Sequence, residues 1–222
     1  MQRTLQTARN NALWCDVVCR AHGCPGEFTP DIWVTRRTAP RYYPNAVTLT
    51  QTGSATQIEH IAALCRAGIP GEWGVKDSFC TLELTPLGFR VLFEAQWIYR
   101  LASLPKPASG GTGVRWGKVR TAAALAEWEE AWRGDAADGD AIFLPALLDV
   151  TDVAVLAAHR GQQIVAGAIA NRSDDVVGVS NIFLRASDGE VLRAGCVGAV
   201  MDAFPDLPLV GCESGAELTA DL

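Results

Sequence analysis

Thiols and an imidazole gather near the start of the chain, where their types are those that bind zinc. Cys15, Cys19, His22 and Cys24 fall within ten residues, and thiolates and imidazoles are common zinc ligands. The spacing differs from that of the usual zinc knuckles, and no second ligand pair accompanies it. Cys15 and Cys19 are four residues apart in NNALWCDVVCRAHG, a stretch with helical spacing of apolar residues. We therefore favour core packing of these thiols and expect no metal.

Composition limits the classes of protein to which the chain can belong. The 222 residues are 49% hydrophobic and 20% charged, enough for one large core or two small ones. No apolar stretch approaches the roughly 20 residues that cross a bilayer, and the N-terminus lacks the apolar core of a signal peptide, so we expect a cytoplasmic protein. The seven cysteines, an odd number, predict reduced thiols. A net charge of -6 argues against nucleic acid and anionic membranes as partners.

The second half of the chain predicts a mixed α/β domain. Residues 104–113, LPKPASGGTG, are typical of a linker. A strand, VRWGKVRT, and a helix, TAAALAEWEEAWRG, follow, and Thr121 and Gly134 are expected to cap this helix. Three β-rich runs with turns at 159–161 and 171–175 then predict an antiparallel meander. The helix GEVLRAGCVGAVMDAF, the strand LPLVGCES and the start of a last helix, GAELTADL, complete the domain.

The first half repeats part of this order. It predicts a hairpin in DIWVTRRTAPRYYPNAVTLT, a helix in SATQIEHIAALCRAG, a strand in EWGVKDSF and a closing strand in RVLFEAQWIYR. The helix at 56–67 corresponds to the helix at 191–204, and the strand around Val75 to the strand around Val210. The predicted domains are an incomplete copy at 1–103, a linker at 104–113 and a second copy at 114–222.

The order of elements over residues 114–222 resembles the GNAT family, the acetyl-CoA-dependent N-acetyltransferases. IVAGAIANRSDDVVGVSNIFL is similar to the central hairpin of that family, and PLVGCESGAEL to the strand and helix that diverge from it. The resemblance implies an α/β fold with a mixed, mainly antiparallel sheet flanked by helices. It also implies a tandem or degenerate two-copy member of the family, a known arrangement.

The second copy stops at Leu222, before the strand that closes the first copy. A sheet edge without its last strand exposes unpaired backbone groups, and such edges are normally covered or paired. We expect the strand at 90–99 to pair there, or else a second chain, which would make the protein a homodimer. A truncated reading frame is the alternative.

In the family, the end of the central strand contacts the pantetheine arm of acetyl-CoA, and the next loop wraps the pyrophosphate. Free amides and the helix dipole favour an anion at such a helix start. The glycine pattern of the family is missing here, and Asp188 and Glu190 oppose a phosphate. The cofactor-binding residues that the resemblance implies in this copy are Ile182, Phe183, Leu184, Arg185 and Gly189.

The corresponding loop of the first copy, TLTQTGSATQIEH, carries no charge before its helix. Gln51 and Gly53 resemble the family pattern, and the Ser54 hydroxyl could cap the helix or touch a phosphate. Of the two loops, this one is the better binding site for an anion. An ordinary capped helix start is the favoured alternative, because such turns are common.

Acetyl transfer needs an oriented amine, a base for its proton and often an acid for the leaving thiolate. In the family a glutamate on the central strand supplies the base and a tyrosine on the last helix supplies the acid. Here the central strand has Asn181, and the last helix has no tyrosine. Glu213, at the end of its strand, is the best remaining carboxylate, with Cys212 beside it, although a structural role is favoured for each.

Two functions follow from these observations. The first is an N-acetyltransferase that moves acetyl from acetyl-CoA to an amine of a small molecule or a peptide. The second is an inactive GNAT-fold binding or regulatory module with a degenerate CoA loop. The resemblance favours the enzyme, because most members of the family are enzymes, whereas the acids in SDGE favour the module.

Overall fold

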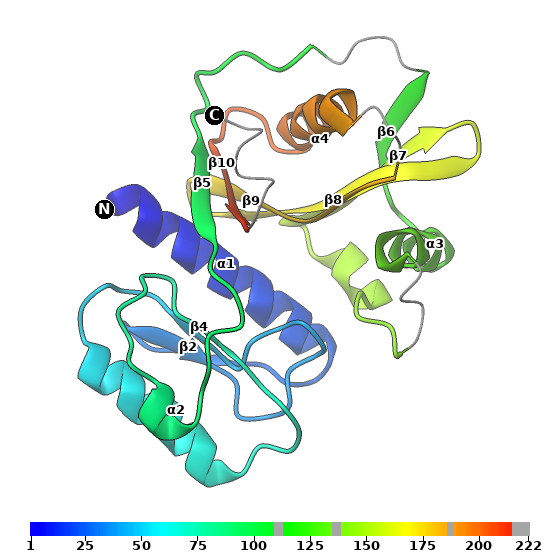
Figure 1. The fold of residues 1–222 in the computed structure, drawn as a ribbon. Coiled ribbons are helices and arrows are strands. Elements are labelled where there is room, and N and C mark those ends of the chain that lie inside the picture. Colours follow the sequence, from blue (N-terminus) through cyan, green and yellow to red (C-terminus); the bar gives the residue numbers. More distant parts are fainter. Residues whose placement is uncertain (109–112, 135–138, 186–188, 215–222) are drawn as a thin grey trace. The chain divides into compact units, whose positions relative to one another are not determined.

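The structure is a computed structural model, and it describes residues 1–108, 113–134, 139–185 and 189–214 (Figure 1). The chain forms two compact units, one of Met1–Trp97 together with the chain from Cys212 on, and one of Ile98–Gly211. The sequence places the change of domain somewhat later, at residues 104–113, and those domain bounds stay a prediction. None of the described helices is long and apolar enough to span a membrane.

The first unit is a small mixed sheet between two helices (Figure 1). The strand order is β1-β2-β3-β4, in which β2 and β3 are antiparallel, and β3 and β4 are parallel. The predicted hairpin and helix are therefore present. The elements are α1 (Gln2–Ala21), β1 (Glu27–Phe28), β2 (Ile32–Val34), β3 (Ala46–Thr48), α2 (Ser54–Ala67), β4 (Val75–Lys76) and the 3-10 turn η1 (Thr85–Leu87).

Strand β2 is buried on both faces because a helix covers each of them. Successive side chains of a strand point to opposite faces, and so Trp33 packs in the cluster with α1, while Ile32 and Val34 pack in the cluster with α2. The α1 cluster also contains three thiols, those of Cys15, Cys19 and Cys24. The expectation that these cysteines pack in the core is confirmed.

The second sheet has six strands in the order β5-β10-β9-β8-β7-β6. Strands β6 to β9 are antiparallel neighbours, and β10 is parallel to β9. A strand of the same chain, β5, thus lies beside β10, at the edge that the sequence leaves open. The elements are β5 (Gln96–Arg100), β6 (Val114–Lys118), α3 (Ala122–Arg133), η2 (Pro145–Asp149), β7 (Val153–Arg160), β8 (Gln163–Ser173), β9 (Val176–Leu184), α4 (Gly189–Ala203) and β10 (Leu209–Glu213).

The mixed α/β fold class predicted from the sequence is confirmed, with two corrections of detail, both at expected turns. The Thr121 hydroxyl caps α3 as expected, since it accepts a hydrogen bond of 3.2 Å from the Ala124 amide. The turns expected at 159–161 and 171–175 are both wrong at their start. Strand β7 continues through Arg160, and the chain reverses at Gly161, which has a φ of +62°. Strand β8 continues through Ser173. The expected last helix, GAELTADL, lies outside the described residues.

Both units contain the same succession of elements. In each, an antiparallel hairpin is followed by a helix and then by a strand parallel to the second strand of the hairpin: β2-β3-α2-β4 in the first unit and β8-β9-α4-β10 in the second. The correspondence between α2 and α4 expected from the sequence follows this topology. That the chain is a tandem member of the GNAT family stays a proposal.

Candidate functional site

Strand β9 is interrupted near its end. The register of β8 shifts between Gly167 and Ile169, so that Asn181 and Ile182 share one partner position. Asn181 has a φ of +53°, a left-handed conformation that asparagine tolerates better than most residues. Its Nδ2 donates a hydrogen bond of 3.0 Å to Ser180 Oγ. Such a bulge bends the strand and redirects the side chains beyond it.

Strands β9 and β10 part just before this bulge. Their parallel pairing joins Val177 to Leu209 and Gly178 to Val210. Among the described residues the pairing goes no further, although β9 continues to Leu184. The last part of β9 therefore offers backbone N–H and C=O groups on the side where β10 would otherwise pair.

The side chains at the end of β9 have different surroundings. Ile182 is 39% exposed, whereas the Phe183 ring packs edge-on against Trp128, with the ring centres 5.4 Å apart. Leu184 packs in a buried cluster with Leu192 and Val165. Ile182 is thus the side chain of the three that can contribute most to a contact with a ligand.

Arg185 extends the ladder between β8 and β9, since its amide donates a hydrogen bond of 2.8 Å to the Val165 carbonyl. Its guanidinium lies against the end of α3: a Cβ placed on Gly134, the residue that ends this helix, would be 2.7 Å from Arg185 Nη2. A cation is stabilised at a helix C-terminus by the helix dipole. This contact supplies a structural role for Arg185.

Helix α4 begins at Gly189, and its first turn carries Glu190. Among the described residues, a Cβ at Gly189 would meet only Leu184 Cδ1, at 3.9 Å. Asp188 lies outside the described residues. A free helix start favours an anion, but the Glu190 carboxylate competes with it for the same dipole.

The start of α2 has a feature that the sequence does not reveal. Gly53 has a φ of +81°, and a Cβ there would be 3.3 Å from Asp31 Oδ1. A carboxylate therefore lies beside the loop of Gln51, Gly53 and Ser54, which the sequence presents as uncharged. Because Asp31 stands far upstream, only the hairpin that brings β2 beside β3 places it there.

A buried amide fixes this loop. Gln57 is fully buried, and its Nε2 donates hydrogen bonds of 3.1 Å to the Asp31 carbonyl and 2.9 Å to the Thr50 carbonyl. The loop that precedes α2 is therefore organised by contacts within the protein, and it has no need of a ligand to hold its shape.

Cys212 and Glu213 are the last two residues of β10, and both are half-buried. Their side chains leave the strand on opposite faces. The Oε2 atom of Glu213 is buried. These two residues belong to the first unit, whereas residues 182–185 belong to the second. Their assignment as catalytic residues stays a prediction.

The thiol cluster near the N-terminus has the properties of a core. Burial raises the pKa of the Cys15 thiol to about 12 and also raises the pKa of the Cys19 and Cys24 thiols. The Cys24 thiol donates a hydrogen bond to the Cys19 carbonyl, with 3.1 Å between sulfur and oxygen. In the part of the chain that the structure describes, no group of three or more His, Cys, Asp or Glu residues could hold a metal ion.

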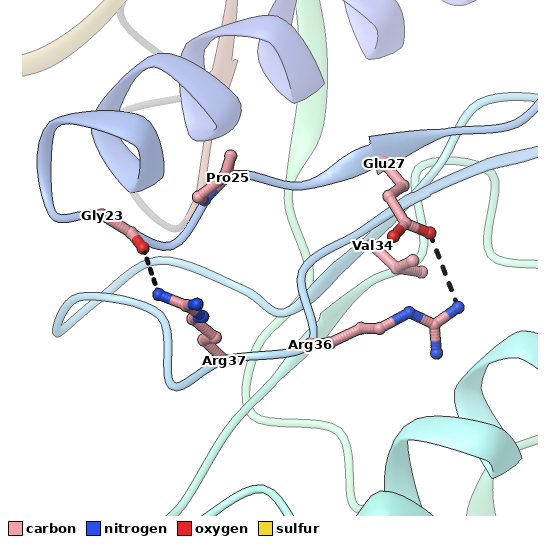
Figure 2. Close-up of a pocket in the computed structure, with 6 residues that line it drawn as sticks. All are labelled: Gly23, Pro25, Glu27, Val34, Arg36 and Arg37. Carbon is pink, nitrogen blue, oxygen red and sulfur yellow. Dashed lines mark hydrogen bonds and ion pairs between the residues drawn. The ribbon is translucent and has the colours of Figure 1, made fainter.

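The first unit also has a surface hollow of about 360 Å³ (Figure 2). None of the residues predicted to form a site lines it. Its two guanidinium groups are engaged, since Arg36 pairs with Glu27 at 3.5 Å and Arg37 donates a hydrogen bond of 2.8 Å to the Gly23 carbonyl. The lining residues are Gly23, Pro25, Glu27, Val34, Arg36 and Arg37.

Two solved structures resemble this chain across most of its length. A GCN5-related N-acetyltransferase from Kribbella flavida superposes with a TM-score of 0.57 at 15% identity, covering 93% of this chain and 85% of its own. A functionally unknown conserved protein from Staphylococcus epidermidis superposes with a TM-score of 0.53 at 10% identity, covering 88% and 85%. Neither a protein-family model nor a curated protein matches the sequence. These similarities establish the fold.

Proposed function

We propose that this protein is a GNAT-like N-acetyltransferase that moves acetyl from acetyl-CoA to an amine of a small molecule or a peptide. The observation that carries the proposal is the end of β9, where the strand bulges at Asn181 and parts from β10 before α4 begins. In the family that the chain resembles, the pantetheine arm lies along this part of the central strand. The similarity to the Kribbella flavida acetyltransferase extends over both units and supports the proposal.

The residues present fit the arm of the cofactor. The backbone groups of β9 beyond its described pairing with β10 could bind the amides of pantetheine, and exposed Ile182 offers an apolar surface. Phe183 and Leu184, whose side chains pack in the core, would contribute through their main chain. Acetyl-CoA would supply the activated thioester, and the protein would hold and orient it against the amine.

The residues present fit the pyrophosphate less well. Each helix start that could receive it has a carboxylate nearby, Glu190 at α4 and Asp31 at α2. An acid in the first turn stabilises its own helix by about 0.3 to 1 kcal/mol and opposes a second anion by the same dipole. This observation favours a second candidate function, that of an inactive GNAT-fold binding or regulatory module whose CoA loop is degenerate.

For the proton transfer, the proposed base is Glu213, with Cys212 as the neighbouring residue. Glu213 ends the strand whose earlier residues pair with β9. A carboxylate within hydrogen-bond reach of the amine could accept its proton as a general base. We also propose that the protein is located in the cytoplasm.

Calorimetric titration with acetyl-CoA tests the binding step. We expect Glu190→Gln to lower the dissociation constant about two- to fivefold if the pyrophosphate lies at α4, because a repelling charge is removed. Asp31→Asn would have this effect instead if the first unit binds the cofactor. Exposed Glu127→Gln on α3 removes the same charge elsewhere and should leave the affinity unchanged. No binding by wild type or by either variant would favour the inactive module.

Release of the CoA thiol in the presence of a panel of amines tests the transfer step. If Glu213 is the base, Glu213→Gln lowers kcat and leaves the dissociation constant for acetyl-CoA unchanged. Equal loss of cofactor binding and turnover would show that the residue supports the structure instead.

A further inference from the structure

An exposed apolar segment lies just before β5. Val91, Leu92 and Phe93 are 80%, 74% and 72% exposed. The segment forms neither helix nor strand in the described structure. Three consecutive large apolar side chains in water are unusual for a folded protein, where such patches commonly mark a surface that binds another molecule.

The exposure of all three side chains is informative. In an extended chain, neighbouring side chains point in opposite directions, so a segment packed on one side would bury at least one of them. Here the first, second and third are all exposed. The segment therefore has solvent on both sides.

The charged residues on either side of the segment would be complementary in a pair of identical copies. Arg90 precedes the apolar residues and Glu94 follows them, and both are exposed. If two copies pair antiparallel about a two-fold axis at Leu92, Arg90 of each copy lies opposite Glu94 of the other, and Val91 lies opposite Phe93. Opposite charges and apolar pairs across an antiparallel ladder are favourable, and a two-fold interface requires such self-complementarity.

We propose that residues 90–94 form an antiparallel interface with the same residues of a second copy of this chain. The order of Arg, three apolar residues and Glu is complementary to itself. It therefore fits a second copy of this segment, in which each of the five residues finds a favourable partner. The next strand, β5, is the terminal strand in its sheet, and an edge strand is a template for pairing with another chain. Five residues make a small interface, so the dimer should dissociate on dilution.

Sedimentation velocity over a range of protein concentrations tests the proposal by charge reversal. Arg90→Glu and Glu94→Arg each place like charges opposite one another twice in the dimer, and each should weaken it by about tenfold. The double variant restores both pairs with reversed sign, and it should regain the wild-type dimer. Exposed Arg66→Glu on α2 is the matched control, with the same change of charge and no expected effect.

A cross-link locates the two-fold axis. In a background in which exposed Cys65 and Cys80 are serine, Leu92→Cys should form a disulfide-linked dimer on oxidation, because the two copies of this residue face each other. Arg90→Cys should cross-link far less, since its counterpart there is Glu94. A wild-type protein that is monomeric at every concentration, or a double charge variant that stays monomeric, would overturn the proposal.

Discussion

At the scale of single residues, Gly167 shows how close packing determines the end of β9. A Cβ on this residue would lie 2.4 Å from Trp128 Nε1 and 2.5 Å from Phe183 Cε1. Trp128 in turn donates a hydrogen bond of 2.8 Å to the Leu156 carbonyl, and so it cannot move without losing this bond. The ring of Phe183 fits at this position because Gly167, opposite it, has no side chain.

We therefore expect Gly167→Ala to lower the free energy of unfolding by about 1 to 3 kcal/mol, the usual cost of overpacking a core. Urea denaturation followed by tryptophan fluorescence measures this change. Gly117→Ala in β6 is the matched control, because a Cβ there meets no atom within 4 Å. An equal loss of stability in the two variants would show that the cost comes from the strand backbone and not from the aromatic packing.

The sequence predicts residues at this scale unevenly. Thr121 could be recognised as a cap because its function is local, and it lies at the start of a periodic run. Asn181 is visible in the sequence as a residue that tolerates a positive φ, but the register shift that uses it depends on β8. Asp31 could not be placed beside Gly53, because that contact exists only once the β2-β3 hairpin has formed.

At the scale of elements, a buried carboxylate ties α3 to the chain that follows it. The Glu129 side chain accepts hydrogen bonds of 2.7 Å from the Ile142 amide and 3.0 Å from the Phe143 amide. It also pairs with Arg133 at 2.5 Å. Phe143 packs edge-on against Trp128 and Trp132, so one acidic residue connects the helix with the core beneath it.

Glu129→Ala should lower the free energy of unfolding by about 3 to 5 kcal/mol, the usual cost of removing one partner of a buried ion pair. Chemical denaturation measures the change. Glu130→Ala, at the next and exposed position of the same helix, should change the stability by less than about 0.5 kcal/mol. If both variants lose little stability, then the contacts of Glu129 contribute less than its burial implies.

Apolar periodicity predicts helices and strands well in this chain, and their pairing less well. The runs around α2, α3 and α4 have the spacing of amphipathic helices, and all three are present. Strand order is a different matter, because β5 precedes the second domain in sequence and lies beside β10 in its sheet. No local pattern specifies such a long-range partner, although the missing edge strand gave reason to expect one.

At the scale of the whole molecule, each unit buries thiols in its core. Burial raises the pKa of Cys15 in the first unit and of Cys196 in the second to about 12, from the ordinary value of 9.0. Cys196 is also part of the buried side of α4. Both thiols are neutral in the folded protein at pH values where an unfolded chain already carries thiolates.

Stability should therefore decline in alkali. Because the pKa of each thiol is higher in the folded state, the contribution of the thiol to the free energy of unfolding is complete below pH 9.0. This contribution is lost as the pH rises towards about 12, because the unfolded chain releases these protons first and is stabilised by doing so. The slope approaches about 1.4 kcal/mol per pH unit for each thiol. Urea denaturation between pH 8 and 10.5 on wild type and on the Cys15→Ala, Cys196→Ala double variant measures it. Identical slopes in the two proteins would contradict this origin.

Binding of acetyl-CoA by this protein can be measured by a thermal shift of the wild-type chain with millimolar acetyl-CoA, free CoA and no ligand. A ligand that binds only the folded state stabilises it by about 2.7 kcal/mol at a hundred times its dissociation constant. For a chain of this length each kcal/mol corresponds to a rise of about 2 to 4 °C in Tm. We expect a Tm that rises with acetyl-CoA concentration, and that rises further in Glu190→Gln if the pyrophosphate lies at α4. An unchanged Tm in wild type and in Glu190→Gln would overturn the proposal that the protein binds acetyl-CoA.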